Sequence, residues 1–172
     1  MIILVLGDVG SGKTSICEKV LAKLEDKGFS CGGLLCPSVF EGGRKIASKA
    51  VDVASGGSVD FCSHKSQGVE GFEFCDWTFL EEGVRFGLKA LEDGISRDVV
   101  FIDEVGPLEL SGAGLAPALP RVFESGKHVI VVMKRHVKDR FYAAYPRVKA
   151  REYDVLDGDV VERIVGRIVD GA

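Results

Sequence analysis

The chain has 172 residues, 46% of them hydrophobic and 28% charged, which excludes an intrinsically disordered protein. This length is typical of one domain with its own core, so we expect residues 1–172 to form a single domain. The formal net charge of −4 gives no general attraction to nucleic acid or to an anionic membrane, and we expect neither as a partner. An anionic ligand would therefore need a local site.

The sequence also lacks the usual signs of export and membrane insertion. Residues 1–13 have no basic segment and no small-residue cleavage site of the kind found in signal peptides. The longest later apolar runs, residues 99–102 and 129–133, are too short to span a bilayer and suit buried strands. The five cysteines form no CxxC pair, which favours reduced thiols over a zinc site. We therefore expect a cytoplasmic protein.

The first half of the chain begins with a clear strand and helix. Residues 2–6 are a continuous apolar run, and helical spacing of apolar side chains follows over residues 14–27, ending at Gly28. Residues 31–39 predict a second strand that enters a loop at Pro37. Two glycine pairs enclose a strand at 44–54, which we interpret as an antiparallel hairpin or insertion at the sheet edge. Residues 60–71 have the weakest pattern and predict a loop.

The second half alternates helices and apolar strands. Helices are predicted at residues 77–93, 116–125, 137–145 and 159–169, and strands at 98–103, 128–133 and 153–155. This alternation is typical of an α/β fold with a mostly parallel sheet. We therefore expect a three-layer sandwich with a small antiparallel insertion at one edge.

Residues 7–14 read GDVGSGKT, which matches the phosphate-binding motif GxxxxGK[ST] at every defined position. The motif also lies in the required context, after an apolar strand and before a helix. Its glycines let successive backbone N–H groups turn toward phosphate oxygens, and the helix adds its positive N-terminal end. We expect these residues to bind a nucleoside triphosphate: Gly7, Asp8, Val9, Gly10, Ser11, Gly12, Lys13, Thr14 and Ser15.

Two side chains of this loop have defined chemistry. Lys13 is expected to reach the β- and γ-phosphates and to act in catalysis, and the Thr14 hydroxyl is expected to ligate Mg²⁺. The alternative is a glycine-rich turn with an exposed lysine, which the strand and helix on either side disfavour. We therefore predict the P-loop NTPase version of the α/β sandwich.

The strand at residues 98–103 ends in two acids, Asp103 and Glu104. In open α/β sheets nucleotides bind at the carboxyl ends of the strands, so Asp103 suits a role in the Mg²⁺ site. Glu104 is placed to orient an attacking water or to accept its proton, and we predict it as a catalytic residue. A solvated acidic strand end is the alternative interpretation.

A basic cluster follows the strand at residues 128–133 and consists of Lys134, Arg135, Lys138 and Arg140. A cation at that edge could stabilise charge on the transferred phosphoryl group, as an arginine finger does. An ordinary basic surface turn is the alternative. We keep Arg135 and Arg140 as candidate site residues.

With these motifs in view, the sequence resembles the THEP1-type nucleoside-triphosphatases, P-loop NTPases related to a human cancer-related NTPase. The stretch 102–110, IDEVGPLEL, looks like an extended signature of that family, and residues 41–46, EGGRKI, are similar to a segment containing Gly-x-Arg. The resemblance spans most of the chain and adds Arg44 as a candidate. Two departures are Ala47-Ser48, where the family has Gly-Phe, and the absence of an Asn-Arg pair at residues 156–159, both of which bear on base contacts.

The resemblance implies a slow Mg²⁺-dependent phosphatase that accepts several nucleoside triphosphates. We therefore expect hydrolysis of ATP, GTP and other NTPs to NDP and phosphate, by a monomer. Two alternatives stay open, a nucleoside or small-metabolite kinase on the same scaffold and a nucleotide-dependent switch with slow hydrolysis. A carboxylate directly after Asp103 favours activation of water over transfer to an acceptor.

Overall fold

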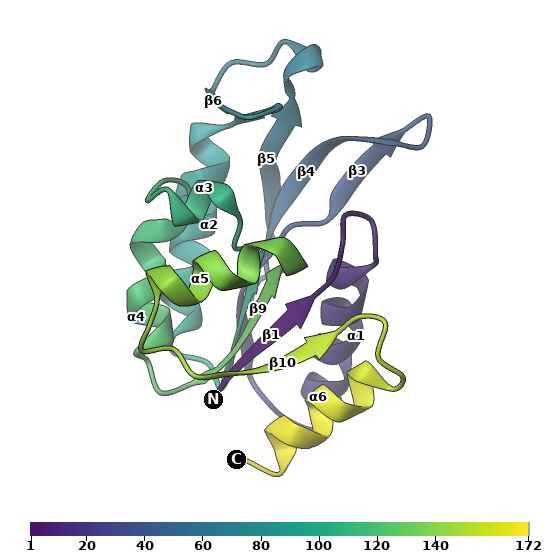
Figure 1. Cartoon of the computed structure of the whole chain (residues 1–172), viewed down its shortest axis with the longest axis vertical. Coiled ribbons are helices and arrows are strands. Elements are labelled where there is room, and N and C mark those ends of the chain that lie inside the picture. The colour runs from purple at the N-terminus through teal and green to yellow at the C-terminus, as the bar shows by residue number, and fades with distance from the viewer. Residues whose placement is uncertain (172) are drawn as a thin grey trace.

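The centre of the molecule is a ten-stranded sheet, seen in a computed structural model that describes residues 1–171 (Figure 1). Five parallel strands form one half of it in the order β10-β1-β9-β8-β2. Their bounds are β1 Ile2–Leu6, β2 Cys31–Leu35, β8 Val99–Asp103, β9 His128–Met133 and β10 Ala150–Asp154. One strand, β9, thus lies between the strand before the phosphate loop and the strand that ends in acids.

The other half of the sheet is antiparallel and continues from β2 through β4, β5 and β7 to β6, with β3 paired to β4. These strands are β3 Ser38–Glu41, β4 Arg44–Asp52, β5 Ser58–His64, β6 Phe72–Phe74 and β7 Trp77–Phe79, and the short helix η1 Lys65–Gln67 follows β5. The expected antiparallel insertion at the sheet edge is therefore confirmed, and it contains five strands.

Helices cover both faces of the sheet, so the expected three-layer arrangement is confirmed (Figure 1). Helices α1 Lys13–Asp26 and α6 Val160–Val169 pack on one face. The other face carries α2 Glu81–Gly94, α3 Pro107–Leu110, η2 Ala116–Ala118, α4 Leu119–Phe123, η3 Arg135–Val137 and α5 Lys138–Ala144. Within residues 1–171, none of the helices has the length and apolar character needed to cross a membrane.

Both faces of the parallel strands are buried, which explains their continuous apolar sequences. In β1, Ile3 and Val5 belong to the core under α1 and α6, whereas Leu4 and Leu6 belong to the core on the opposite face. Burial of each such side chain stabilises the fold by about 1.5–3 kcal/mol. These two cores hold the carboxyl ends of the strands in fixed register, and the site is built at those ends.

Three predicted elements differ from the structure. Residues 60–71 do not form one loop, because β5 extends through His64 and pairs with β4, a contact that local sequence does not encode. The helix predicted at 77–93 begins only at Glu81, and the β-favouring residues before it form β7. The strand predicted at 31–39 is divided at Pro37 into β2 and β3.

Candidate active site

The phosphate loop joins the buried end of β1 to the first residue of α1. Gly10 and Gly12 have φ angles of 73° and 86°, in the left-handed region that favours glycine. At Gly7 the chain passes so close to its neighbours that an added Cβ would lie 2.3 Å from the Ser11 Oγ. The glycines of the motif are thus required by the backbone path, and the loop leads directly into the helix N-terminus.

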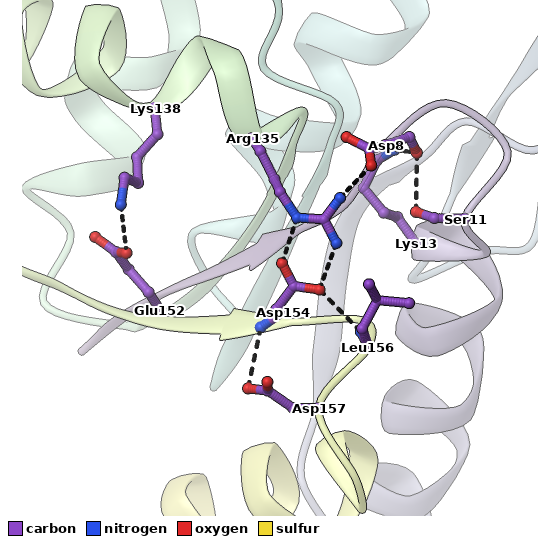
Figure 2. A network of polar contacts seen from close by, with 9 residues as sticks. All are labelled: Asp8, Ser11, Lys13, Arg135, Lys138, Glu152, Asp154, Leu156 and Asp157. Carbon is purple, nitrogen blue, oxygen red and sulfur yellow. Dashed lines mark hydrogen bonds and ion pairs between the residues drawn. The ribbon is translucent and has the colours of Figure 1, made fainter.

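Lys13 lies at the centre of this loop and is buried, with 8% of its surface exposed. Its Nζ donates a hydrogen bond of 2.7 Å to the Asp8 carbonyl oxygen, and the Ser11 hydroxyl donates to the same oxygen at 2.8 Å (Figure 2). Burial lowers the pKa of Lys13, while the nearby charges of Glu104 and Asp103 act in the opposite direction. The ammonium group therefore lies between the phosphate loop and the acidic strand end.

Asp103 is the buried acid of the site. Its Oδ2 accepts a hydrogen bond of 2.7 Å from the Thr14 hydroxyl and one of 3.1 Å from the Cys36 N–H. Burial raises the pKa of Asp103 to about 6, although these two hydrogen bonds favour the charged form. The structure thus joins the two residues that the sequence predicted as Mg²⁺ ligands.

Glu104 differs from Asp103 in its exposure to solvent. About a third of its side chain is exposed, and its Oε1 lies 3.6 Å from the Nζ of Lys134, which follows β9. The two acids at the end of β8 therefore have different environments, one buried beside Thr14 and one partly open to solvent beside a lysine. Such a pair can divide metal binding and proton transfer between its members.

Arg135 forms a bridge between the phosphate loop and β10, shown in Figure 2. Its guanidinium donates two hydrogen bonds to the Asp154 carboxylate, at 2.5 and 2.6 Å, and a third to the Asp8 carboxylate. These partners raise the pKa of Arg135, the hydrogen bonds with Asp154 contributing most. In this arrangement Arg135 holds the loop and β10 together, because all three bonds are made to protein carboxylates.

The other candidates are less closely connected to the site. Arg140 lies exposed on α5 and Arg44 lies exposed at the start of β4, and neither forms a hydrogen bond or ion pair with the side chains described here. Val9 is 74% exposed at the tip of the loop, and Ser15 is exposed in the first turn of α1. The structure therefore brings together Lys13, Thr14, Asp103 and Glu104, but not the two exposed arginines.

The donor set at the loop fits Mg²⁺ better than a metal held mainly by protein. Within residues 1–171, no group of three or more His, Cys, Asp or Glu side chains could hold a metal ion. The hydrogen-bonded Thr14 hydroxyl and Asp103 carboxylate offer two oxygen ligands. Mg²⁺ is usually bound through one or two such groups together with substrate phosphates and waters, so these residues suit it.

Three contacts of the site were missed by the sequence analysis. Lys134 was treated only as part of a basic cluster, since its position beside Glu104 depends on β9 lying next to β8. The Cys36 N–H is a backbone group, so the identity of that residue carries no signal. Glu109 is buried behind the acidic turn, and its place in the IDEVGPLEL stretch was its only signal.

A phosphate loop after a buried strand, opposite a second strand that ends in Asp103 and Glu104, defines a P-loop nucleotide-binding protein. The sequence profile described as NTPase matches residues 2–168, and the chain belongs to this family of nucleoside-triphosphatases, which are hydrolases acting on phosphoanhydride bonds. The resemblance stated from the sequence is thereby confirmed.

Relatives of known name and structure agree with this assignment. The chain is 30% identical to the nucleoside-triphosphatase THEP1 of Methanopyrus kandleri, over 95% of this chain and 94% of that protein. It is also 30% identical to the nucleoside-triphosphatase THEP1 of Hyperthermus butylicus, over 94% and 90% of the two chains. In fold it is similar to THEP1 from Aquifex aeolicus, with a TM-score of 0.75 and 17% identity over 98% of this chain and 99% of that one. It is also similar in fold to a human cancer-related nucleoside triphosphatase, with a TM-score of 0.69 and 18% identity over 98% of this chain and 95% of that one.

Proposed function

We propose that this protein hydrolyses nucleoside triphosphates to the diphosphate and phosphate, depends on Mg²⁺ and accepts several bases. One observation carries the proposal: Glu104 lies partly exposed directly after the buried Asp103, opposite a complete phosphate loop. A carboxylate in that position can act on a water molecule, whereas transfer to an acceptor would need a second binding site.

The phosphate loop supplies the binding of the triphosphate. Backbone N–H groups of the loop beyond Gly7 and the ammonium of Lys13 bind phosphate oxygens, and Lys13 leaves the Asp8 carbonyl to do so. Thr14 and Asp103 would hold Mg²⁺ through their side-chain oxygens. When bound, Mg²⁺ neutralises charge on the phosphate oxygens and so assists the departure of the diphosphate.

Glu104 provides the proton chemistry. Its carboxylate orients a water molecule toward the γ-phosphorus and accepts one proton as the water oxygen attacks. Lys134, whose Nζ lies 3.6 Å from the Glu104 Oε1, places a positive charge beside that carboxylate. Among the arginines, we propose a supporting role for Arg135, through its hold on Asp8, and none for Arg44 or Arg140.

Base tolerance follows from what the loop contacts. The groups assigned here bind phosphates and Mg²⁺, which are the same in every nucleoside triphosphate. The name nucleoside-triphosphatase, carried by the relatives, likewise specifies no base. We further propose that the chain acts in the cytoplasm, as a monomer with a single domain.

The proposal is tested by phosphate release from ATP, GTP, CTP and UTP, with and without Mg²⁺, for the wild type, Lys13→Ala and Glu104→Ala. We expect turnover of several of the four without an acceptor, and loss of turnover in both variants and in EDTA. Tight Mg²⁺–ATP binding without phosphate release by the wild type would instead point to a kinase that lacks its acceptor or to a switch that lacks its partner.

A further inference from the structure

Glu109 is a buried carboxyl group that the hydrolysis scheme above does not use. It is 5% exposed and lies in the first turn of α3, five residues after Glu104. Its Oε2 accepts a hydrogen bond of 2.9 Å from the Gly106 N–H, and its Oε1 accepts a longer one of 3.5 Å from the Leu115 N–H. The carboxylate therefore ties together the beginning and the end of the segment 106–115.

The surrounding backbone is built closely around this carboxylate. Gly114 has a φ of 60°, and an added Cβ there would lie 2.6 Å from the Glu109 Oε1. A Cβ added at Gly106 would lie 3.6 Å from the Glu109 Oε2 and 3.7 Å from the Glu104 Oε1. The carboxyl groups of Glu104 and Glu109 thus both lie near Gly106, and the backbone of residues 104–109 links their positions.

Backbone hydrogen bonds hold the turn that carries Glu104, and one of them runs from the Leu110 N–H to the Gly106 carbonyl at 3.0 Å. The Val105 N–H donates to the Val132 carbonyl on β9 at 2.8 Å, and the Gly106 N–H donates to Glu109. Among residues 1–171, the Glu104 carboxylate has one ion-pair partner, Lys134 at 3.6 Å, and both side chains are about a third exposed. An ion pair of that length and exposure is weak. The direction of Glu104 therefore depends on the backbone of residues 105–106.

We propose that Glu109 is a positioning residue for hydrolysis, whose carboxylate holds the turn at residues 104–106 and thereby aims Glu104 at the attacking water. The proposal rests on the proposed function, since it assumes that Glu104 acts on water. It does not involve phosphate or Mg²⁺ binding, because Glu109 contacts neither the phosphate loop nor Asp103. A change at Glu109 should therefore lower kcat and leave nucleotide affinity intact.

The ionisation of Glu109 provides a second readout. Burial raises the pKa of Glu109 to about 7, its hydrogen bonds with Gly106 and Leu115 lower it, and the charge of Glu104 raises it further. Tyr145, directly after α5, and the Cys36 thiol, between β2 and β3, are further titratable groups whose pKa is raised by burial and also by the Glu109 charge, and η2 presents Ala116 and Pro117 on this side. Glu109, Ala116, Pro117 and Tyr145 line an open pocket of about 310 Å³. When Glu109 is protonated, one of its two carboxylate oxygens becomes an O–H donor. The turn then loses the hydrogen bond that this oxygen accepted from the Gly106 or the Leu115 N–H.

The test compares the wild type with Glu109→Gln and with Glu124→Gln. Glu124 is an exposed glutamate at the end of α4, so Glu124→Gln is a matched control. Three quantities are measured: kcat and KM for Mg·ATP from pH 5.5 to 9, the dissociation constant of Mg·ADP by calorimetry, and the melting temperature. We expect Glu109→Gln to lower kcat at least tenfold at pH 8 and to change the Mg·ADP dissociation constant less than twofold. The variant should also lose the decrease in kcat that the wild type shows as the pH falls through about 7. Glu124→Gln should behave like wild type.

Other results would overturn the proposal. An unchanged kcat and pH profile in Glu109→Gln would remove the positioning role, as would a fall in kcat matched by an equal loss of Mg·ADP affinity. If Glu109→Gln does not fold, the pH dependence of kcat in the wild type still tests the proposal. A wild-type kcat that does not change between pH 6 and 8 contradicts it. Protonation of Asp103 is recognised separately because it weakens Mg·ADP binding. Failure of the proposed function itself would appear as a wild type without phosphate release at any pH.

Discussion

The Thr14 hydroxyl donates a hydrogen bond of 2.7 Å to the Asp103 carboxylate across 89 positions of sequence. This contact joins the first turn of α1 to the end of β8, past the intervening strand β9. It brings the only two predicted metal ligands within one hydrogen bond of each other. Four predictions concern this pair and the charged side chains around it.

The first prediction concerns Asp103→Asn. Because the pKa of Asp103 in the folded protein, about 6, lies above its usual value near 4, the folded state binds more protons than the unfolded state between these pH values. Stability therefore falls as pH rises through this window, and the full cost of the buried charge is present above pH 6. We expect Asp103→Asn in EDTA to raise the free energy of unfolding by about 1–3 kcal/mol at pH 7.5.

Urea unfolding at pH 7.5 and pH 4 measures this effect, with Asp76→Asn as a matched change at an exposed aspartate. The gain should be largely lost at pH 4, where Asp103 is protonated in the folded state and about half protonated in the unfolded state. Hydrolysis by Asp103→Asn should fall at least about a hundredfold, since the variant lacks the charged ligand for Mg²⁺. A variant less stable than wild type at pH 7.5 would show that the carboxylate is favourable where it lies.

The second prediction concerns Lys13→Ala. The ammonium group is buried between the loop and two acids, so its removal takes a positive charge out of the loop itself. We expect turnover of ATP to fall by about a thousandfold or more, with weaker Mg·ATP binding. Steady-state phosphate release measures the effect, and Lys23→Ala, in the same helix but paired with Glu162 at the surface, serves as control. Undiminished turnover in Lys13→Ala would rule out this loop as the phosphate site.

The third prediction separates binding from chemistry at Glu104. Because Glu104 is assigned to the water and not to the metal, Glu104→Gln should lower kcat by about a hundredfold to ten-thousandfold. Its dissociation constant for Mg·ADP should stay within about twofold of wild type, since neither phosphate nor Mg²⁺ contacts depend on this carboxylate. Calorimetry and phosphate release measure the two effects, with Glu25→Gln on the surface of α1 as control. Weaker Mg·ADP binding would move Glu104 into the metal site.

The fourth prediction compares Arg135→Ala with Arg140→Ala. Arg135 makes three hydrogen bonds that join Asp8 to Asp154, whereas Arg140 is exposed and makes none that the structure describes. We expect Arg135→Ala to lower kcat/KM by about tenfold, because the phosphate loop loses its tie to β10, and Arg140→Ala to stay within about twofold. Initial rates with Mg·ATP measure both. If both variants keep the full kcat, neither arginine supports catalysis.

The elements that could be predicted were those encoded by local sequence. The phosphate loop, β1 and the acidic end of β8 are each a short pattern whose structure is decided by neighbouring residues: apolar runs, glycines and a helix start. The family resemblance rested on residues 102–110, which form this same acidic end and the turn after it.

The missed elements depend on contacts between distant segments. Strand β5 exists because it pairs with β4, and its polar Ser63 is buried there, which no local pattern indicates. Lys134 meets Glu104 only because β9 lies beside β8. The support of Asp103 by Cys36 comes from a backbone N–H, so a side-chain pattern could not reveal it.

The position of β9 has a consequence for redesign of the enzyme. Its end is bonded to both halves of the site, since the Met133 carbonyl accepts from the Gly7 N–H at 3.4 Å and the Val132 carbonyl accepts from the Val105 N–H at 2.8 Å. The strand is therefore a spacer that separates β1 from β8 by two strand widths, about 10 Å. Lys134 is the first residue beyond this spacer and is partly exposed. Substitutions at residue 134 can thus change the charge beside Glu104 while the spacing of the two halves stays constant.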